Sequence, residues 1–185
     1  HVNPPLARLL ELTQRDQRFV HAQGNRLIDA RGHTYVDWVA GFGALALGHR
    51  PRVALDALTR FAAADAPHLH VEAINPAAGA LARELCAATS GDFDTVFFGN
   101  SGTEAVEAAV KACVAATGRR VIVYAQGAYH GTTLGALAAT SRREFRAPFV
   151  EHLSPHVVRL PFAGRQAPVH EPAADIAAQY LRDCR

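Results

Sequence analysis

A serine and a glutamate mark the point where a buried-looking strand gives way to a helix. Ser101 and Glu104 fit the S-x-x-E capping box, which predicts that Ser101 is the N-cap of that helix. Gly102 lets the backbone approach an oxygen atom closely, and the unpaired N–H groups of a first helical turn suit a phosphate. A helix that is only well capped explains the same residues, and such helices outnumber phosphate sites. Both interpretations stay open on this motif alone.

An aromatic residue and a histidine follow the next predicted strand. Tyr129 and His130 are expected at the carboxyl edge of the same sheet, which is where open α/β folds bind ligands. A tyrosine ring at that edge can stack on a flat cofactor. On these two residues alone, the favoured alternative is that Tyr129 packs in the core and His130 caps or hydrogen-bonds a loop.

Helices and strands in alternation must position these residues. The periodicity predicts helices over 3–12, 51–64, 77–89, 103–116, 133–140 and 171–185, and strands over 18–21, 26–29, 34–38, 94–98, 120–124 and 157–160. Residues 142–164 are expected to form a loop around the last strand. The alternation after residue 76 indicates an α/β fold with a parallel sheet covered by helices. Because so few parallel strands leave a sheet unfinished, we expect the remainder beyond Arg185.

The composition excludes several classes of partner. The chain has 185 residues, 49% of them hydrophobic, with 19 basic against 17 acidic residues and a net charge of +2. This balance provides no basic stripe for nucleic acid, and the longest apolar run is too short to cross a bilayer. The three cysteines form no CxxC pair, which predicts no structural metal site and a reducing, cytoplasmic location. The chain begins with His1 and holds no methionine, so we expect that it starts inside a reading frame.

Three segments together resemble a known family. The chain resembles the class III pyridoxal-phosphate-dependent aminotransferases in three segments: GFGALALGHRP at 41–51, FFGNSGTEAVE at 97–107 and YHGTTLGAL at 129–137. FRAPF at 145–149 and LPF at 160–162 add a likeness to the putrescine and ornithine aminotransferases. The resemblance implies an incomplete large domain of a fold type I PLP-dependent transferase, preceded by the N-terminal segment of the small domain. It divides the chain into residues 1–55 for the small domain and 56–185 for the cofactor domain.

The resemblance also assigns roles in cofactor binding. It implies that Ser101, Gly102 and Thr103 hold the phosphate of pyridoxal 5'-phosphate. Tyr129 would stack on the pyridine ring, and His130 would accompany it. Relatives of this fold place their active sites at a two-fold interface, so a homodimer is implied as well.

Two further residues are implied to face the substrates, which are an amine and a 2-oxo acid. Phe42 would border the substrate pocket, although a phenylalanine packed in the core is an equal alternative. Thr132 stands where acetylornithine aminotransferases carry an arginine that meets the substrate carboxylate. Because a hydroxyl cannot replace a bidentate guanidinium, a diamine or another ω-amino donor is expected instead.

The chain offers no lysine for a Schiff base with the cofactor. Lys111 is its one lysine, ten residues past Ser101 on the predicted helix, which at ~1.5 Å per residue puts it about 15 Å away. Glu107 precedes it by four residues, which predicts a helical ion pair. In the family, the Schiff-base lysine and the acidic partner of the ring come later in the sequence. We therefore expect no catalytic residue in this segment and no transamination by it alone.

Other classes explain parts of the pattern. Residues 99–103 nearly match the G-x-S-x-G motif of α/β-hydrolases, with Ser101 as nucleophile and His130 as base, but Thr103 replaces the second glycine. Gly41, Gly43 and Gly48 have the wrong spacing for a dinucleotide loop. His68 and His70 lack a third metal ligand nearby. A non-catalytic piece that contributes only binding or dimer contacts is the stronger alternative.

Overall fold

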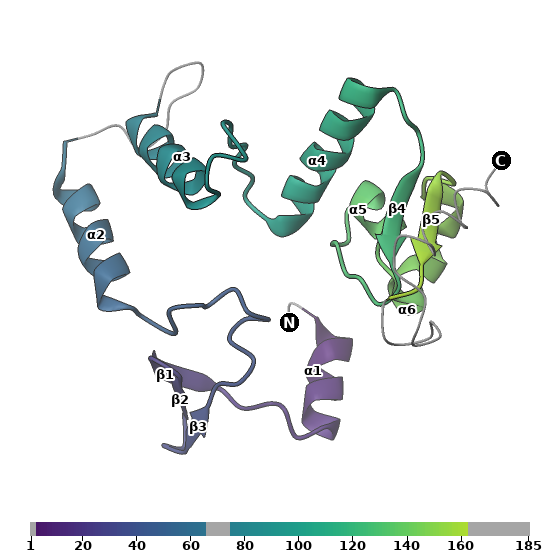
Figure 1. Cartoon of the computed structure of the whole chain (residues 1–185). Coiled ribbons are helices and arrows are strands. Elements are labelled where there is room, and N and C mark those ends of the chain that lie inside the picture. Colours follow the sequence, from purple (N-terminus) through teal and green to yellow (C-terminus); the bar gives the residue numbers. More distant parts are fainter. Residues whose placement is uncertain (1–2, 66–74, 163–185) are drawn as a thin grey trace, which may run out of the picture. The chain divides into compact units, whose positions relative to one another are not determined.

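The computed structural model describes residues 3–65 and 75–162. The chain forms two compact units, residues 1–74 and 75–185, and each is described separately (Figure 1). The assignment of residues 1–55 to a small domain and 56–185 to a cofactor domain stays a prediction.

The first unit contains two helices and a small antiparallel sheet. Helix α1 spans Pro4–Leu12 and α2 spans Arg52–Ala63. Strands β1 Phe19–Gln23, β2 Arg26–Asp29 and β3 Thr34–Val36 pair in the order β1-β2-β3. These elements confirm the predicted ones to within one or two residues. The last strand ends early because the side chain of Asp37 accepts hydrogen bonds from the N–H groups of Val39 and Ala40, which turns the chain.

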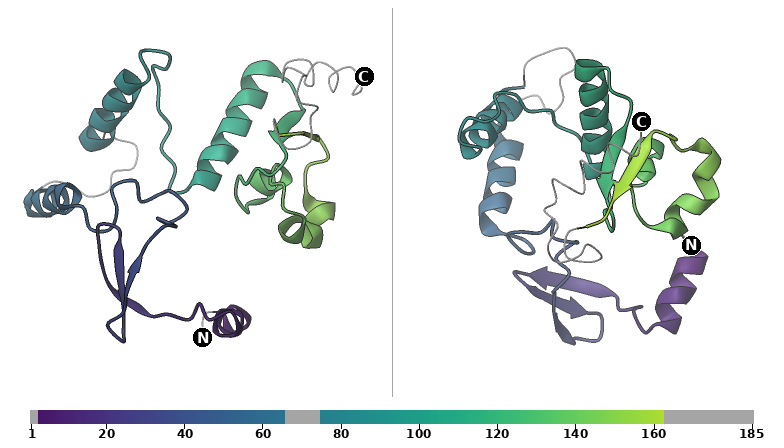
Figure 2. Two further views of the ribbon diagram at one scale, coloured as in Figure 1. Left: turned by 60° about the horizontal axis from the view of Figure 1, so that its bottom comes forward. Right: turned by 45° about the vertical axis from the view of Figure 1, so that its right-hand side comes forward.

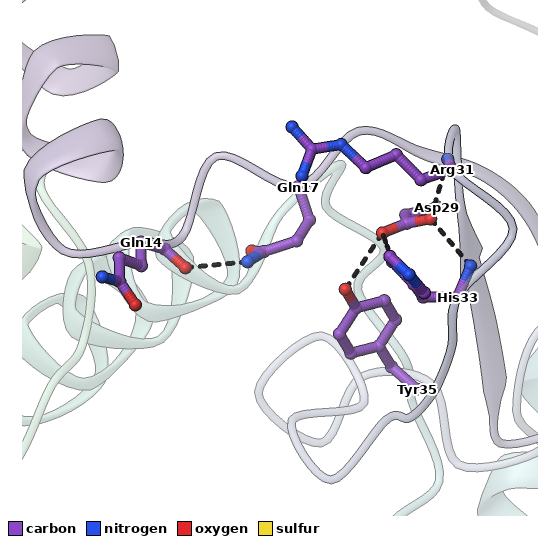
Figure 3. A network of polar contacts seen from close by, with 6 residues as sticks. All are labelled: Gln14, Gln17, Asp29, Arg31, His33 and Tyr35. Carbon is purple, nitrogen blue, oxygen red and sulfur yellow. Dashed lines mark hydrogen bonds and ion pairs between the residues drawn. The ribbon is translucent and has the colours of Figure 1, made fainter.

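A buried carboxylate holds the end of this meander together. Asp29, which is 5% exposed, accepts hydrogen bonds from the backbone N–H groups of Arg31 and His33 and from the hydroxyl of Tyr35 (Figure 3). Burial would raise the pKa of Asp29, but these hydrogen bonds, that of His33 foremost, lower it to about 2. The ring of Tyr35 also contacts Phe19 edge to face at 5.5 Å.

The second unit carries two long helices, several short ones and a parallel pair of strands. Its elements are α3 Pro76–Ala88, α4 Gly102–Thr117, β4 Ile122–Ala125, α5 Leu134–Ala138, α6 Arg143–Arg146, the 3-10 helix η1 Ala147–His152 and β5 Val157–Leu160. Strands β4 and β5 run parallel (Figure 2), and their register places Ile122 opposite Val157. Helix α5 contacts both α4 and α6, and residues 136–140 are almost completely buried. This short helix is therefore the centre of the unit.

Two predictions about this unit are wrong. Residues 94–98 form no strand, because in the described part of the chain no neighbouring strand pairs with them, and Phe97 stays 72% exposed. The expected loop after Arg142 instead contains α6 and η1, which are too short to produce a helical period in the sequence.

Two remaining predictions concern residues outside the described ranges. The helix predicted over 171–185 and the His68 and His70 pair both lie there. Within residues 3–65 and 75–162, no group of three His, Cys, Asp or Glu residues could hold a metal ion. In the same ranges no helix has the length and apolar character needed to span a bilayer.

Candidate functional site

The turn before α4 adopts the predicted N-cap geometry. Ser101 is extended, and its Oγ accepts a hydrogen bond from the N–H of Glu104 at 3.3 Å. The carboxylate of Glu104 returns to the N–H of Asn100 and not to that of Ser101, so the reciprocal half of the capping box lies one residue earlier. The predicted helix start at this serine is confirmed.

The first two amides of α4 are open to a ligand. In the described part of the chain, the N–H groups of Gly102 and Thr103 have no protein acceptor. A Cβ built on Gly102 would meet no atom within 4 Å, so the space beside this residue is open. The hydroxyl of Ser101 accepts from Glu104 and still has a proton to donate. Two free amides, a hydroxyl and the positive end of a 16-residue helix are a donor set that fits a phosphate.

The hydroxyl of Thr103 is used within the protein. Its Oγ1 lies 2.8 Å from Oγ1 of Thr133, and Thr133 donates to Oε1 of Glu107. The pKa of Glu107 is lowered, foremost by the hydrogen bond from Thr133, so this carboxylate is ionised at neutral pH and only accepts. Because Thr133 has one proton and gives it to Glu107, Thr103 must donate to Thr133. Toward a phosphate, Thr103 therefore offers its backbone N–H.

Glu107 has a role that the sequence did not reveal. Its Oε1 also accepts the N–H of Ala136 at 3.0 Å, so a side chain of α4 caps the first turn of α5. A Cβ on Gly135 would overlap this carboxylate. The predicted ion pair with Lys111 is wrong, because the lysine nitrogen does not lie within 4.0 Å of a carboxylate oxygen of Glu107. The charge of Lys111 still contributes to the lowered pKa of Glu107. The nearby helix start is the better partner because it offers amide donors and a hydroxyl.

The loop after β4 is fastened at both ends by α5 and the residues that follow it. The N–H of Gly127 donates to Oγ of Ser141 at 2.9 Å, and the N–H of Ser141 donates to the carbonyl of Ala128 at 2.7 Å. The N–H of His130 donates to Oγ1 of the buried Thr140 at 3.0 Å. This part of the chain is thus held at a fixed place on the buried helix.

Tyr129 projects from this loop and is not a core residue. Its side chain is 58% exposed, and its ring contacts that of Phe145 edge to face, with centroids 6.0 Å apart. The alternative that buries Tyr129 in the core is therefore wrong. A single edge-to-face contact leaves at least one face of the tyrosine ring free of Phe145 and available for stacking.

A glycine joins the loop to the helix start. Gly131 is buried, has a φ of +123°, and a Cβ there would overlap the side chain of Thr103. The structure therefore brings together two of the predicted motifs, the first turn of α4 and the loop that carries Tyr129. Their contact depends on a residue without a side chain.

The other candidate residues of this unit are less constrained. His130 is half-buried and Thr132 is exposed, and neither side chain forms a hydrogen bond within the described residues. No hydrogen bond joins His130 to Ser101 in that part of the chain. The hydrolase alternative therefore lacks the bond between nucleophile and base that it needs.

Phe42 belongs to the first unit, on a turn with unusual backbone. Residues 40–43 all have positive φ, and Phe42 is 98% exposed, so its packing in a core is wrong. Across the base of this segment, Nε2 of His49 lies 2.8 Å from Oδ2 of Asp37. The pKa of Asp37 is lowered, first by the hydrogen bond from the N–H of Ala40 and then by that from His49. The turn is thus held at its base while the phenylalanine is fully presented.

Comparison with known proteins gives the same family as the motifs. Residues 13–185 match the model of the aminotransferase class-III family. The chain is 41% identical over 167 residues to the aminotransferase PigE of Serratia sp., covering 90% of this chain and 20% of that protein. It is 41% identical over 129 residues to the putrescine aminotransferase of Pectobacterium atrosepticum, covering 68% of this chain and 27% of that protein. The chain therefore spans about a fifth to a quarter of these curated relatives.

A solved structure shows the same fold. The taurine:2-oxoglutarate aminotransferase of Bifidobacterium kashiwanohense, determined with PLP and glutamate, superimposes with a TM-score of 0.77 at 24% identity, covering 91% of this chain and 38% of that one. This likeness confirms the predicted α/β fold as part of a PLP-dependent transferase fold. The match of the family model to nearly the whole chain shows that it belongs to the class III aminotransferases, a family that uses pyridoxal phosphate.

Proposed function

We propose that this chain supplies the phosphate cradle and the ring-stacking residue of a PLP-dependent transaminase. Ser101, Gly102 and Thr103 hold the cofactor phosphate, Tyr129 stacks on the pyridine ring, and His130 lies beside it. The observation that carries this proposal is the pair of unpartnered amides at the start of α4, set against the loop with the exposed tyrosine.

Each of these residues has a defined task. Bound pyridoxal phosphate supplies an electron sink for the substrate carbon that loses a proton. The amides of Gly102 and Thr103 and the hydroxyl of Ser101 bind the phosphate and so fix the position of the ring. Tyr129 orients the ring by stacking and excludes water from one of its faces. Glu107 and Thr133 hold the helix start and the loop in register.

The proposed reaction moves an amino group from a diamine or another ω-amino donor to a 2-oxo acid. Two observations support the donor class: the likeness to a putrescine aminotransferase and the exposed hydroxyl of Thr132. Phe42 and Thr132 are the proposed substrate contacts. We expect the full-length protein to turn over putrescine faster than acetylornithine, and equal or faster turnover of acetylornithine would contradict this.

The Schiff-base lysine is proposed to lie outside this segment of the protein. Lys111 is the only lysine here, and it lies on α4 nine residues after Gly102, which is about 14 Å along the helix. The segment alone is therefore expected to bind cofactor without transaminating. A homodimer is proposed on the family resemblance, and a cytoplasmic location on the free Cys86 and Cys113.

The cradle is tested by titrating the full-length protein with pyridoxamine phosphate, which needs no lysine for binding. Ser101→Ala removes a hydrogen bond to a charged group and should weaken binding about tenfold. Ser90→Ala, at an exposed serine outside the cradle, is the matched control and should bind like the wild type. A colourless protein whose absorbance does not change on borohydride treatment would favour the non-catalytic alternative.

A further inference from the structure

A cavity lies in the second unit, and none of the residues assigned to cofactor or substrate lines it. Its volume is about 480 Å³, and it is lined by Ser141, Arg143, Arg146, Ala147, Val150 and Arg159. These residues come from the segment after α5, from α6 and η1, and from β5. The cavity is thus built by the crossover between the two parallel strands and by one of those strands.

The lining is strongly positive. Arg143, Arg146 and Arg159 contribute three guanidinium groups and no lining residue is acidic. None of the three forms an ion pair with a carboxylate in residues 3–65 and 75–162. Because guanidinium groups stay charged at every physiological pH, their mutual repulsion favours an anion between them.

One of these arginines is held in place and left with an unused donor. Nη1 of Arg146 donates to the hydroxyl of Tyr124 at 2.9 Å, and its guanidinium lies 5.9 Å from the centre of that ring. Its Nε is buried and has no hydrogen-bond partner. Among the described residues, it is the one buried side-chain nitrogen or oxygen without a partner. A buried charged donor without an acceptor is costly, so an acceptor oxygen placed at this Nε would be stabilising.

The sheet and the loop add two more groups. Arg159 is opposite Tyr124 in the register of β4 and β5, so both side chains lie on the same face of the sheet as Arg146. Oγ of Ser141 accepts the N–H of Gly127 at 2.9 Å and has its own proton free to donate. Three arginines and a serine therefore line one cavity.

We propose that this cavity binds a small organic anion that carries phosphate or carboxylate groups. The planar fork of arginine matches both groups with two parallel hydrogen bonds, and 480 Å³ is the size of a small-molecule site. The site shares no residue with the proposed cofactor cradle, although its Ser141 is hydrogen-bonded to the loop that carries Tyr129. The cradle has backbone amides at its centre, whereas this cavity has charged side chains.

The test is a calorimetric titration of the full-length protein after borohydride reduction, which fixes the cofactor and keeps anions out of the cradle. Pyrophosphate and citrate are the two probes, and we expect saturable binding of one molecule per chain. Tighter binding of pyrophosphate identifies a phosphate ligand, and tighter binding of citrate a carboxylate ligand. Arg143→Gln and Arg159→Gln, both at exposed side chains, should each weaken binding about tenfold.

Arg120→Gln is the matched control, because it removes the same charge from an exposed arginine outside the cavity. It should leave the affinity within about twofold, as expected for a distant surface charge. The proposal is overturned if neither probe binds saturably, if the two cavity variants bind like the wild type, or if the control weakens binding equally. A protein that takes up no cofactor would refute the proposed function. The weaker binding of the probes to the cavity variants could still be measured in such a protein, so the two proposals can fail separately.

Discussion

Asp29 and Glu107 are two carboxylates that collect several hydrogen bonds over very different distances in the sequence. The partners of Asp29 lie two, four and six residues further along the chain. Those of Glu107 lie 26 and 29 residues further along. Asp29 therefore stabilises one hairpin locally, whereas Glu107 determines how a helix, a loop and a second helix meet. Only the second arrangement can carry a binding site built from separate motifs.

The largest effect is expected from Gly131→Ala, which breaks the contact between loop and helix. A Cβ there would overlap Thr103 in addition to straining a φ of +123°. We expect the free energy of unfolding to fall by roughly 3 kcal/mol and the binding of pyridoxamine phosphate to be lost. Gly127→Ala is the matched control, since Gly127 also has positive φ but open space around a Cβ. It should cost only ~1 kcal/mol of backbone strain and keep binding. Equal effects of the two variants would mean that the contact is unimportant.

The next effect is expected from Glu107→Ala, which removes the acceptor for Thr133 and Ala136. The first turn of α5 loses its cap, and the affinity for pyridoxamine phosphate should fall about tenfold. Glu84→Ala, at an exposed glutamate on α3, should leave it unchanged. Glu107→Gln keeps an amide oxygen as acceptor and should recover part of the loss. If both variants of Glu107 bind like the wild type, the long-range carboxylate does not position the cradle.

A smaller effect is expected from Thr133→Val, which keeps the shape of the side chain and removes the hydroxyl between Thr103 and Glu107. The loss of these hydrogen bonds should weaken cofactor binding about fivefold, equivalent to ~1 kcal/mol. Thr133→Ser retains the hydroxyl and should bind within about twofold of the wild type. A serine variant as weak as the valine variant would show that the methyl group of Thr133 matters and its hydrogen bonds do not.

The smallest effect on binding is expected from Asp29→Asn, which sharpens the contrast with Glu107. The pKa of Asp29 is lowered from 3.8 to about 2, so its contribution to stability is complete above pH 3.8 and is lost as the pH falls through about 2. Thermal denaturation between pH 2 and 7 should show a flatter acid dependence and a lower midpoint at pH 7 for the variant. Cofactor affinity should not change. A change in that affinity as large as for Glu107→Ala would contradict the separation between the two carboxylates.

The same contrast explains what the sequence could predict. Helix α4 begins at the residue after Ser101 because the capping box is encoded within four residues. The turns of the meander are encoded equally locally, at 23–25 and 30–32. Such features depend on neighbours along the chain and could be read directly.

What was missed depends on distant partners. Glu107 precedes Lys111 by four residues, which is a typical helical ion pair, but a helix start that lies far along the chain is the better partner for the carboxylate. Residues 94–98 have the composition of a strand, yet a strand forms only where a neighbour pairs with it. The unused donor of Arg146 likewise gives no signal in the sequence, because it follows from packing against Tyr124.

The most direct test of the central claim is a crystal structure of the full-length protein with pyridoxamine phosphate. The phosphate oxygens should lie about 2.7–3.2 Å from the backbone nitrogens of Gly102 and Thr103, with the Tyr129 ring parallel to the pyridine ring. A phosphate bound elsewhere, or amides of this turn bonded to protein atoms while the cofactor is present, would contradict the claim.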